Sequence, residues 1–372
     1  MATRDGLVVP EVFTPYLVEQ TTLNDKFAQS GVARQLTELD ISSVRGGDTV
    51  TMPYYKADLT GEFTDLEVGK SLVPQRIGGD NQKAVVLHRG LAYSASDLTA
   101  ITVGSESTDP MAAIGQKLGV NIAHEKEKDL LRVLNGVFGT CKADSINAAL
   151  KQNLVAGDSG AKEKDVAVPF NMTNVLKAQY NLGDAAGKLT TIAMHSIFYY
   201  DLLAKGLVVQ TALTNETDAK NNTASASATS IDFKTNNLSA YGNVNFGTYM
   251  GLNIIVTDNL GKEKDNKGDD NGTSAVDCSP IYLFGEGVIG TGQQAAQRVR
   301  TDTDILSMEE TLAVDAHYIY HPIGTKWVGA AADANPDSDT LQDVSKWKLC
   351  YELKNVPLAR INAILPSTYV NA

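Results

Sequence analysis

The chain has 372 residues, of which 43% are hydrophobic, and a formal net charge of −12. This length and composition suffice for two ordinary domains with a sizeable core. The acidic balance argues against a protein that binds nucleic-acid backbones over a broad surface, because such proteins carry an excess of Lys and Arg. The three cysteines, Cys141, Cys278 and Cys350, are too widely spaced for a disulfide framework or a CxxC metal site.

The sequence shows no membrane or secretion signal. No stretch approaches the ~18 consecutive apolar residues of a membrane helix, and the N-terminus lacks the basic-then-apolar layout of a signal peptide. We therefore expect synthesis in the cytoplasm and no membrane partner.

The chain begins with residues that predict an arm and two strands. Residues 1–45 carry scattered apolar side chains, too few for a core of their own, which predicts an arm with one or two short helices. Residues 48–56 alternate apolar and polar side chains as a half-buried strand does, and residues 82–93 predict a second strand.

The 25 residues between these strands, Ala57–Asn81, are too many for a hairpin turn of ~2–5 residues. They are too apolar for a disordered linker and too sparse in apolar residues for a domain. Two solutions remain open. The segment folds back on its own protein, or it forms a projecting two-stranded arm that buries its apolar residues on a neighbouring subunit. An isolated two-stranded ribbon is only marginally stable, so the second solution requires assembly.

Residues Ser107–Phe138 predict one long helix. Asp109 is a suitable N-cap, Pro110 suits the first helical position, and Gly136 and Gly139 bracket the far end, where a C-cap belongs. About 29 residues at ~1.5 Å each make a rod of roughly 43 Å.

The apolar residues of this helix change face along its length. Met111, Ile114, Leu118 and Ile122 share one face, whereas Leu130, Leu134 and Val137 lie roughly opposite. Between them lies the polar stretch His124–Asp129. One interpretation is an amphipathic helix with a solvated middle, and the other is a spine on which separate parts of the structure pack.

The polar stretch 139–168 predicts a boundary, and residues 169–320 predict an α/β region. We expect helices near 171–182 and 195–206 and strands at 188–194, 251–258, 279–286, 311–330 and 346–353. Two polar insertions, 214–237 and 261–275, predict exposed loops. The apolar tail after residue 357 is expected to be packed against the rest of the protein.

One motif suggests an enzyme. Gly285–Gly290 matches the G-x-G-x-x-G pattern of dinucleotide-binding sites, follows a predicted strand, and has Asp304 about 20 residues further on. The helix that such a site requires would be GTGQQAAQRVR, which opens with further glycine, and no train of βα units follows. A cytoplasmic NAD-binding enzyme is therefore retained as an alternative of another class.

Two histidines suggest a metal site. His317 and His321 lie on one face of a predicted strand, where two imidazoles could bind zinc, but no Cys or carboxylate completes a ligand set at a suitable spacing. We expect buried or interfacial histidines instead. With no catalytic, cofactor or metal constellation found, the sequence favours a binding or structural role over an enzyme.

The order of these parts and several stretches of sequence resemble the major capsid proteins of tailed bacteriophages, whose shell fold is shared with herpesvirus capsid floors and encapsulins. The stretches are LVVPEVFTPYLVEQT near the N-terminus, MHSIFYYDLLAKGLV at 194–208, GLNIIVTDN at 251–259, YLFGEGVIGTG at 282–292 and HYIYHPIGTKW at 317–327. The resemblance covers nearly the whole chain.

The resemblance implies an α+β fold with the parts of that family. These would be an N-terminal arm at 1–45, an extended loop at 46–95, a peripheral domain at 96–167 and 316–372 with the spine helix 107–138, and an α/β axial domain at 168–315. It implies a coat protein that self-assembles, as hexamers and pentamers, into an icosahedral head shell around double-stranded DNA. An encapsulin-like cargo compartment is the alternative within the same fold.

The resemblance also implies partners and contacts. It implies a portal, a separate scaffolding protein because no scaffolding segment precedes the arm, DNA held without sequence-specific binding, and assembly in the bacterial cytoplasm before residence in the virion. Some family members cross-link a lysine of the extended loop, but nothing here supplies a partner for Lys70, so no cross-link is predicted. Candidate inter-subunit residues are Leu59, Phe63, Leu66, Lys70, Leu72, Val73, Arg76, Arg89, Glu125, Lys126, Glu127 and Lys128.

Overall fold

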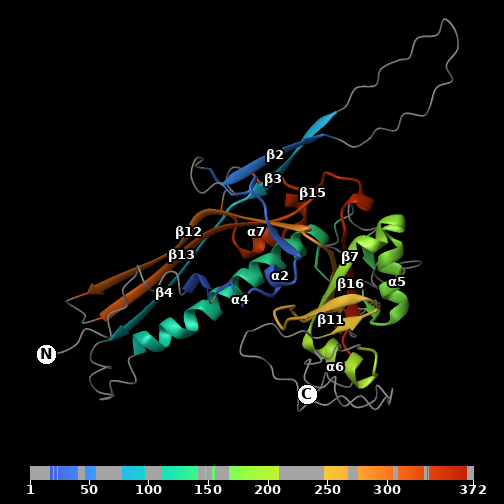
Figure 1. The fold of residues 1–372 in the computed structure, drawn as a ribbon, viewed down its shortest axis with the longest axis horizontal. Coiled ribbons are helices and arrows are strands. Elements are labelled where there is room, and N and C mark those ends of the chain that lie inside the picture. The colour runs from blue at the N-terminus through green and yellow to red at the C-terminus, as the bar shows by residue number, and fades with distance from the viewer. Residues whose placement is uncertain are drawn as a thin grey trace, which may run out of the picture.

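The computed structural model describes residues 17–19, 21–22, 24–40, 47–55, 78–96, 110–140, 147, 153–155, 167–208, 247–266, 275–304, 309–330, 333 and 335–366. They form an elongated molecule with a narrow sheet at one end and a compact α/β part at the other (Figure 1). Helix α4 (Pro110–Phe138) runs along the narrow sheet toward the compact part.

The compact part is built on an eight-stranded sheet, here called the large sheet. Its strands are β5 (Leu154–Val155), β6 (Val168–Pro169), β7 (Leu189–Met194), β8 (Thr248–Tyr249), β9 (Leu252–Val256), β10 (Glu263–Asn266), β11 (Ala275–Gly285) and β16 (Leu358–Ile364). Residues 281–284 of β11 are all fully buried, because both faces of the sheet are covered. The apolar tail of the chain is packed as expected, since β16 pairs with β11, β5 and β6.

Two helices pack on the large sheet, α5 (Met172–Tyr180) and α6 (Ser196–Ala204). The side chain of Asn171 caps α5 by accepting a hydrogen bond from the Asn174 N–H. Gly206, in the left-handed conformation at φ +65°, follows α6 at the predicted C-terminal end. Both helices confirm the sequence-based prediction.

The narrow sheet, here called the long sheet, has four strands in the order β1-β12-β13-β4. Their bounds are β1 (Ala33–Gln35), β4 (Leu87–Ser96), β12 (Ile289–Asp304) and β13 (Glu309–Pro322). The stretch GTGQQAAQRVR, which a dinucleotide site would need as a helix, is part of the extended strand β12. The G-x-G-x-x-G stretch therefore does not form a dinucleotide-binding turn and helix.

The glycines of this stretch instead make room for the N-terminal segment. A Cβ atom on Gly292 would collide with the backbone carbonyl of Leu39, and one on Gly290 would lie 2.7 Å from Leu36 Cδ1. Strand β1 pairs in parallel with the first residues of β12, and the short helix α2 (Lys26–Gln29) precedes it. The glycines thus allow close packing of residues 33–39 on β12.

Helix α4 begins at Pro110, as predicted, and ends at Phe138, with Gly139 following at φ +97°. Gly136 lies inside the helix and is not a cap. It gives space to Trp347 and to the Leu341 carbonyl, which a Cβ atom there would strike. Because of this contact the short helix α7 (Ser338–Gln342) packs closely on α4.

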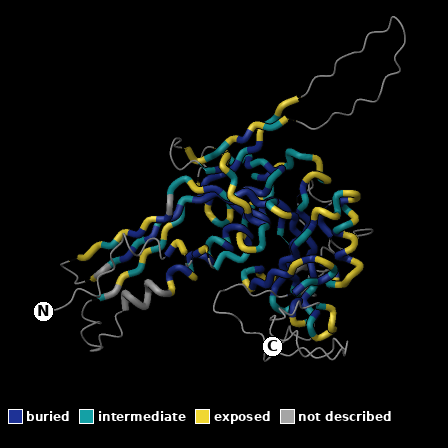
Figure 2. The backbone as a smooth tube through the Cα atoms, in the orientation of Figure 1, coloured by how far each residue is buried: buried dark blue, intermediate teal, exposed yellow. Residues whose placement is uncertain are grey.

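The two ends of α4 pack into different clusters, as the change of apolar face predicts. Leu118 and Ile122 pack with residues of the long sheet, including Leu312 and Val314. The C-terminal half, residues 130–138, belongs to the main core, together with side chains of both sheets. Burial increases along the helix toward the centre of the molecule (Figure 2).

A separate antiparallel pair, β2 (Thr49–Tyr55) and β3 (Gly79–Val85), extends from the body of the molecule (Figure 1). The single strand predicted at 82–93 is divided at Val86, where β3 ends and β4 begins. Residues 84–87 are consecutively buried and alternate between two hydrophobic clusters. The chain therefore passes from one sheet to another at this point without a turn.

Other differences from the sequence-based prediction are local. The polar stretch 261–275 contains β10, which pairs with β11. The strand predicted at 346–353 is the three-residue β15 (Trp347–Leu349), paired with β14 (Thr325–Trp327). Short 3₁₀ helices complete the fold: η3 (Gly183–Lys188), η6 (Val344–Lys346) and η7 (Leu353–Asn355).

The expected boundary between axial and peripheral parts does not coincide with a change of sheet. Residue 316 lies inside β13, and β12 belongs to the long sheet although it was grouped with the axial part. Strand β16, grouped with the peripheral part, lies in the large sheet. The division into two domains remains a prediction. Among the described residues, no helix is long and apolar enough to cross a membrane.

Candidate functional site

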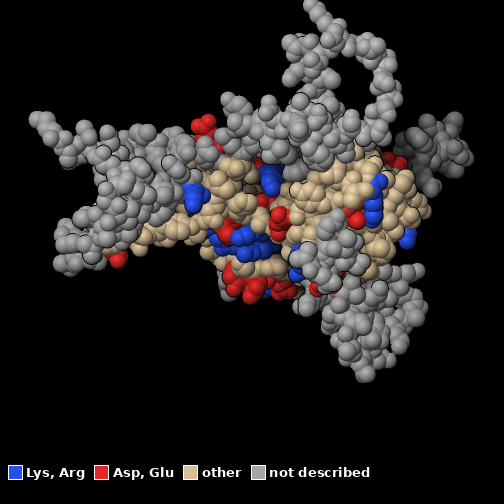
Figure 3. Space-filling view, turned by 90° about the horizontal axis from the view of Figure 1, so that it is seen from below, with Lys and Arg blue, Asp and Glu red and all other residues tan. Residues whose placement is uncertain are grey.

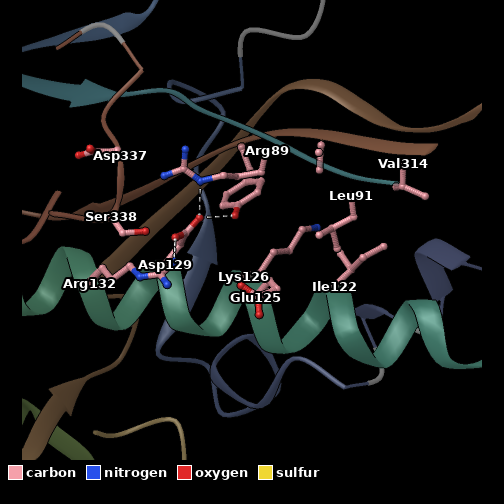
Figure 4. A pocket seen from close by; sticks show the side chains of 13 residues that line it. Arg89, Leu91, Ile122, Glu125, Lys126, Asp129, Arg132, Val314, Asp337 and Ser338 are labelled. Atoms are coloured by element: carbon pink, nitrogen blue, oxygen red, sulfur yellow. Dashed lines mark hydrogen bonds and ion pairs between the residues drawn. The ribbon is translucent and has the colours of Figure 1, made fainter. Parts of the chain in front are cut away.

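A cavity of about 370 Å³ lies between α4, β4 and β13 (Figure 4). Its apolar lining comes from Leu91, Ile122, Val314, Ala316 and the ring of Tyr318. Its charged lining comes from Arg89, Glu125, Lys126, Asp129, Arg132 and Asp337. Three of the residues predicted to contact other subunits, Arg89, Glu125 and Lys126, thus lie at one place in the fold.

Asp129 is the centre of the charged lining. Its carboxylate is 2% exposed and accepts hydrogen bonds from Arg89 Nε at 2.9 Å, Arg132 NH1 at 2.6 Å and the Tyr318 hydroxyl at 2.7 Å (Figure 4). Burial, and next the Asp129 charge, raise the pKa of Tyr318 well above its ordinary value. The hydroxyl therefore stays protonated as a donor, and the buried carboxylate is compensated by three donors.

Lys126 differs from these residues in the surroundings of its ammonium group. Burial lowers its pKa, and the charge of Asp25 partly opposes that shift. The Nζ atom lies 5.5 Å from the centre of the Tyr318 ring. Among the residues that the structure describes, no carboxylate lies within ion-pair distance of it. A cation at the apolar part of the cavity is suited to bind a carboxylate from outside.

The rest of the charged stretch His124–Asp129 is not a solvated strip, so that interpretation is wrong. Glu127 is 8% exposed, and its Oε2 accepts a hydrogen bond of 2.8 Å from the Asn259 side chain, in the loop after β9. Glu125 and Lys128 form the half-exposed part, with an ion pair of 2.6 Å. Glu127 and Asp129, two residues apart, therefore lie on different faces of the helix with separate partners, whereas Glu125 and Lys128, three apart, form a surface ion pair.

Arg89 was expected to form an ion pair between subunits, and within the subunit it pairs with Asp129. Its NH2 group also donates to the Pro336 carbonyl at 3.0 Å. The role of Arg89, Glu125, Lys126, Glu127 and Lys128 at a neighbouring subunit stays a prediction. The loop candidates Leu59, Phe63, Leu66, Lys70, Leu72, Val73 and Arg76 lie outside the described residues.

Charges of both signs are intermixed on the underside of the molecule, close to its middle (Figure 3). The described residues of that face form no broad patch of Lys and Arg of the kind that binds phosphate backbones. The distribution agrees with the net charge of −12.

The two histidines considered for zinc do not meet. His321 is fully buried, its Nε2 lies 3.3 Å from Gln82 Oε1, and burial lowers its pKa to about 4. His317 instead contacts His88 of the neighbouring strand. Within the described part of the chain, no three His, Cys, Asp or Glu side chains are arranged to hold a metal ion.

Sequence reasoning missed the most deeply buried charge, Arg360 in β16. Its guanidinium donates to the Gly139 carbonyl at the end of α4 and to Asn135 Oδ1 at 3.3 Å, and it lies 5.5 Å from the Tyr282 ring. The sequence contained one clue, a single arginine in the apolar run LARINAIL. An arginine in a buried strand needs hydrogen-bond acceptors for its guanidinium group.

The Ser196 hydroxyl lies 3.3 Å from His195 Nδ1, and Asp258 Oδ1 lies 3.7 Å from the same nitrogen. That nitrogen also accepts a hydrogen bond from the Ile197 N–H and caps α6, so we interpret this contact as part of a helix cap. The cavity joins an apolar floor to one available ammonium group and to a fixed ion network. This arrangement is suited to a side chain that is partly apolar and partly acidic, and such a combination is typical of a protein–protein contact.

Comparison with known proteins gives two findings and one negative result. The chain matches no protein-family model. It is 30% identical over 358 residues to the protein named "Major capsid protein" of Bacillus phage SPP1, and the match covers 95% of each chain. The solved Cyanophage Pam1 capsid asymmetric unit aligns with a TM-score of 0.51 and 17% identity, over 92% of this chain and 93% of that chain.

Proposed function

The chain belongs to the family of phage major capsid proteins, and from this premise we propose that its copies assemble into the icosahedral shell enclosing the double-stranded DNA genome of a tailed phage. The observation that carries the proposal is the sequence match over 95% of both chains, which leaves no room for an unrelated additional domain in the matched length. The α+β fold is that of tailed-phage capsid proteins, as the Pam1 likeness shows.

The finer parts of the proposal concern partners and place. Subunits gather as hexamers and pentamers, with a separate scaffolding protein and a portal, in the host cytoplasm, and the product is the virion head. The DNA is enclosed without sequence-specific binding. The intermixed surface charges and the net charge of −12 support this, because sequence-independent phosphate binding needs clustered Lys and Arg (Figure 3).

We further propose that the segment Ala57–Asn81 of one subunit contacts the cavity on α4 of another. Between residues 58 and 68 this segment repeats an acidic residue followed by an apolar one, as Asp58-Leu59, Glu62-Phe63, Asp65-Leu66 and Glu67-Val68. The cavity offers the complementary chemistry, since Lys126 adjoins an apolar floor. The acidic side chain of one such dipeptide would pair with Lys126, and its apolar side chain would lie on the apolar floor.

Electron microscopy of the purified protein tests the assembly. Expression of the chain, alone and with its scaffold, is expected to give uniform closed shells. A small monomer under every condition would contradict the proposal. Particles that contain an enzyme instead of DNA would favour a cargo compartment, an alternative that the comparisons do not favour.

Deleting residues 60–78 tests the proposed arm. The variant is expected to keep the circular dichroism and urea midpoint of the intact subunit but to form no stable shell. An unfolded subunit would mean that the segment folds back into its own core, which is the other solution that the sequence leaves open.

Lys126→Met tests the cavity, with Lys117→Met as the matched control at an exposed position of the same helix. Methionine keeps the apolar length of lysine and removes the charge. Shell yield is expected to fall for the first variant and to remain near that of the intact protein for the control. Equal yields for both variants would contradict a carboxylate partner at Lys126.

A further inference from the structure

Two histidines face each other at the base of the β2–β3 hairpin. His88 lies at the start of β4 and pairs in register with His317 of β13. Their ring planes are inclined at 65°, with centres 4.9 Å apart, and their Nδ1 atoms are 2.7 Å apart. That distance is a hydrogen bond, which requires a proton on one of the two nitrogens and a lone pair on the other.

The outer nitrogen of each ring faces a carboxylate. His317 Nε2 lies 3.2 Å from Asp315 Oδ2, and His88 Nε2 lies 3.6 Å from Asp48 Oδ1. Asp315 in turn accepts hydrogen bonds from Arg298 of β12. A row of polar contacts therefore runs from Asp48, just before β2, across three strands of the long sheet.

The charged groups around the pair carry an excess of positive charge, which disfavours protonation of both rings. Arg298 NH2 lies 3.3 Å from His317 Nε2, and Arg300 Nε lies 3.9 Å from Asp315 Oδ1, both from β12. On the side of α4, Lys126 lines a small cavity together with His317. The two carboxylates therefore already face three cations before either ring is charged.

We propose that His88 and His317 share a single proton and form an acid-sensitive latch that holds the β2–β3 hairpin on the long sheet. One proton fits between the Nδ1 atoms and makes the hydrogen bond. When both rings are protonated, two N–H groups and two positive charges face each other, and the contact opens. Imidazole is the side chain most readily protonated by mild acid, so acid is the signal that opens the latch.

The histidine pair lies at the place where the β2–β3 hairpin meets the long sheet. The Val86 N–H, at the point where β3 becomes β4, donates to the Asp48 carbonyl at 2.9 Å. The Asp48 side chain is linked through His88 to β13. Opening the latch removes the side-chain link between the hairpin base and the sheet and leaves this backbone bond in place.

A proton explains the geometry better than a metal ion. Zinc sites in proteins use three or four side-chain ligands, and the described residues offer no such group. Each carboxylate lies behind a ring, beside its outer nitrogen, and not at the facing nitrogens.

Hydrogen exchange of the full-length, unassembled subunit between pH 7.5 and 5 tests the latch, with His317→Gln as the comparison. The glutamine amide can hydrogen-bond to His88 without titrating. Comparing the two proteins at each pH cancels the intrinsic pH dependence of exchange. As the pH falls below about 6, residues 79–90 of the wild type are expected to lose protection about three- to tenfold relative to the variant, the size of one hydrogen bond.

A control and two overturning outcomes complete the test. His124→Gln, which changes an exposed histidine on α4, is expected to keep the wild-type pH dependence. The same pH dependence in wild type and His317→Gln would overturn the proposal. So would a change in wild-type exchange at pH 7.5 on adding a chelator, because a metal would then occupy the facing nitrogens.

If His317→Gln does not fold, nitrogen NMR of the wild-type histidine side chains measures the same proton. A proton on the Nδ1 of one ring of the pair at pH 7 supports the latch. Protons on both Nδ1 atoms, or on neither, would overturn it. The His88→Gln variant repeats the exchange test from the other ring.

Discussion

The two sheets of this molecule bury their side chains in different ways. In the large sheet, residues 358–363 of β16 and 281–284 of β11 are buried on both faces. In β13 of the long sheet, buried and half-buried residues alternate from Thr311 to His317, and only the part from Tyr318 to Pro322 is buried throughout. The outer half of the long sheet is thus covered on one face, where α4 packs (Figure 2).

This difference indicates which region holds itself together. A sheet covered on both faces has its own core. The outer half of the long sheet, where only β12, β13 and β4 pair, depends on the helix packed against it. Helix α4 belongs to both regions, since one end packs in the cluster of the long sheet and the other in the main core. For a shell subunit, the one-sided region is the part that neighbours can cover.

The largest effect is expected where the two regions are joined. Arg360→Ala leaves the Gly139 carbonyl and Asn135 without their donor and opens a cavity, because the side chain of Arg360 is fully buried. We expect the free energy of unfolding to fall by roughly 3–5 kcal/mol, measured by urea denaturation of the unassembled subunit. Arg300→Ala, at a side chain that is 67% exposed, is the control and should cost less than about 0.5 kcal/mol. Similar losses of stability in both variants would contradict the conclusion that Arg360 joins the two regions.

The same substitution in each sheet tests the comparison directly. Leu283 of β11 and Leu312 of β13 are 0% and 1% exposed. Leu283→Ala is expected to cost roughly 3–5 kcal/mol, and Leu312→Ala roughly 2–3 kcal/mol, because the one-sided ribbon can close over the cavity more easily. Hydrogen exchange should localise the second loss to the long sheet. Equal costs spread over the whole subunit would remove the distinction between the two regions.

The buried histidine of β13 predicts a dependence of stability on pH. Burial lowers the pKa of His321 to about 4, whereas an unfolded histidine has a pKa near 6.5. Below pH 6.5 the unfolded chain takes up a proton that the folded chain does not, so stability is present above that pH and is lost as the pH falls toward 4. The loss reaches on the order of 3 kcal/mol at ~1.4 kcal/mol per unit.

His321→Gln checks this prediction by denaturation at pH 7 and at pH 4.5. The variant is expected to lose less stability between these pH values than the wild type does. The effect concerns global unfolding, so it is separate from the local opening proposed for His88 and His317. If the variant and the wild type lose the same stability between pH 7 and pH 4.5, His321 is protonated in the folded subunit.

The sequence predicts the large sheet better than the long one. Short apolar runs such as YLF at 282–284 and the positions of α5 and α6 follow from local signals, and the structure confirms them. The division of the strand at Val86 was missed, because four buried residues in a row are compatible with one strand or with a passage between two sheets. Pairing between distant segments decides that question, and local periodicity does not record it.

The site was predicted in part. The polar stretch His124–Asp129 was correctly identified as unusual, but its exposure was not, since a charged residue in sequence gives no sign of its partner. The partners of Asp129 come from β4 and β13, far away in the chain. The i,i+3 spacing of Asp129 and Arg132 was the one local clue.

The smallest effect is expected at the surface ion pair of α4. Lys128→Ala breaks the pair with Glu125, and both side chains are about 40% exposed, so the unassembled subunit should lose at most ~0.5 kcal/mol of stability. A fall in shell yield well beyond that loss would identify the pair as a contact between subunits. Unchanged yield and stability would restrict the contact on this helix to the cavity at Lys126, where the one-sided region presents a cation to its neighbour.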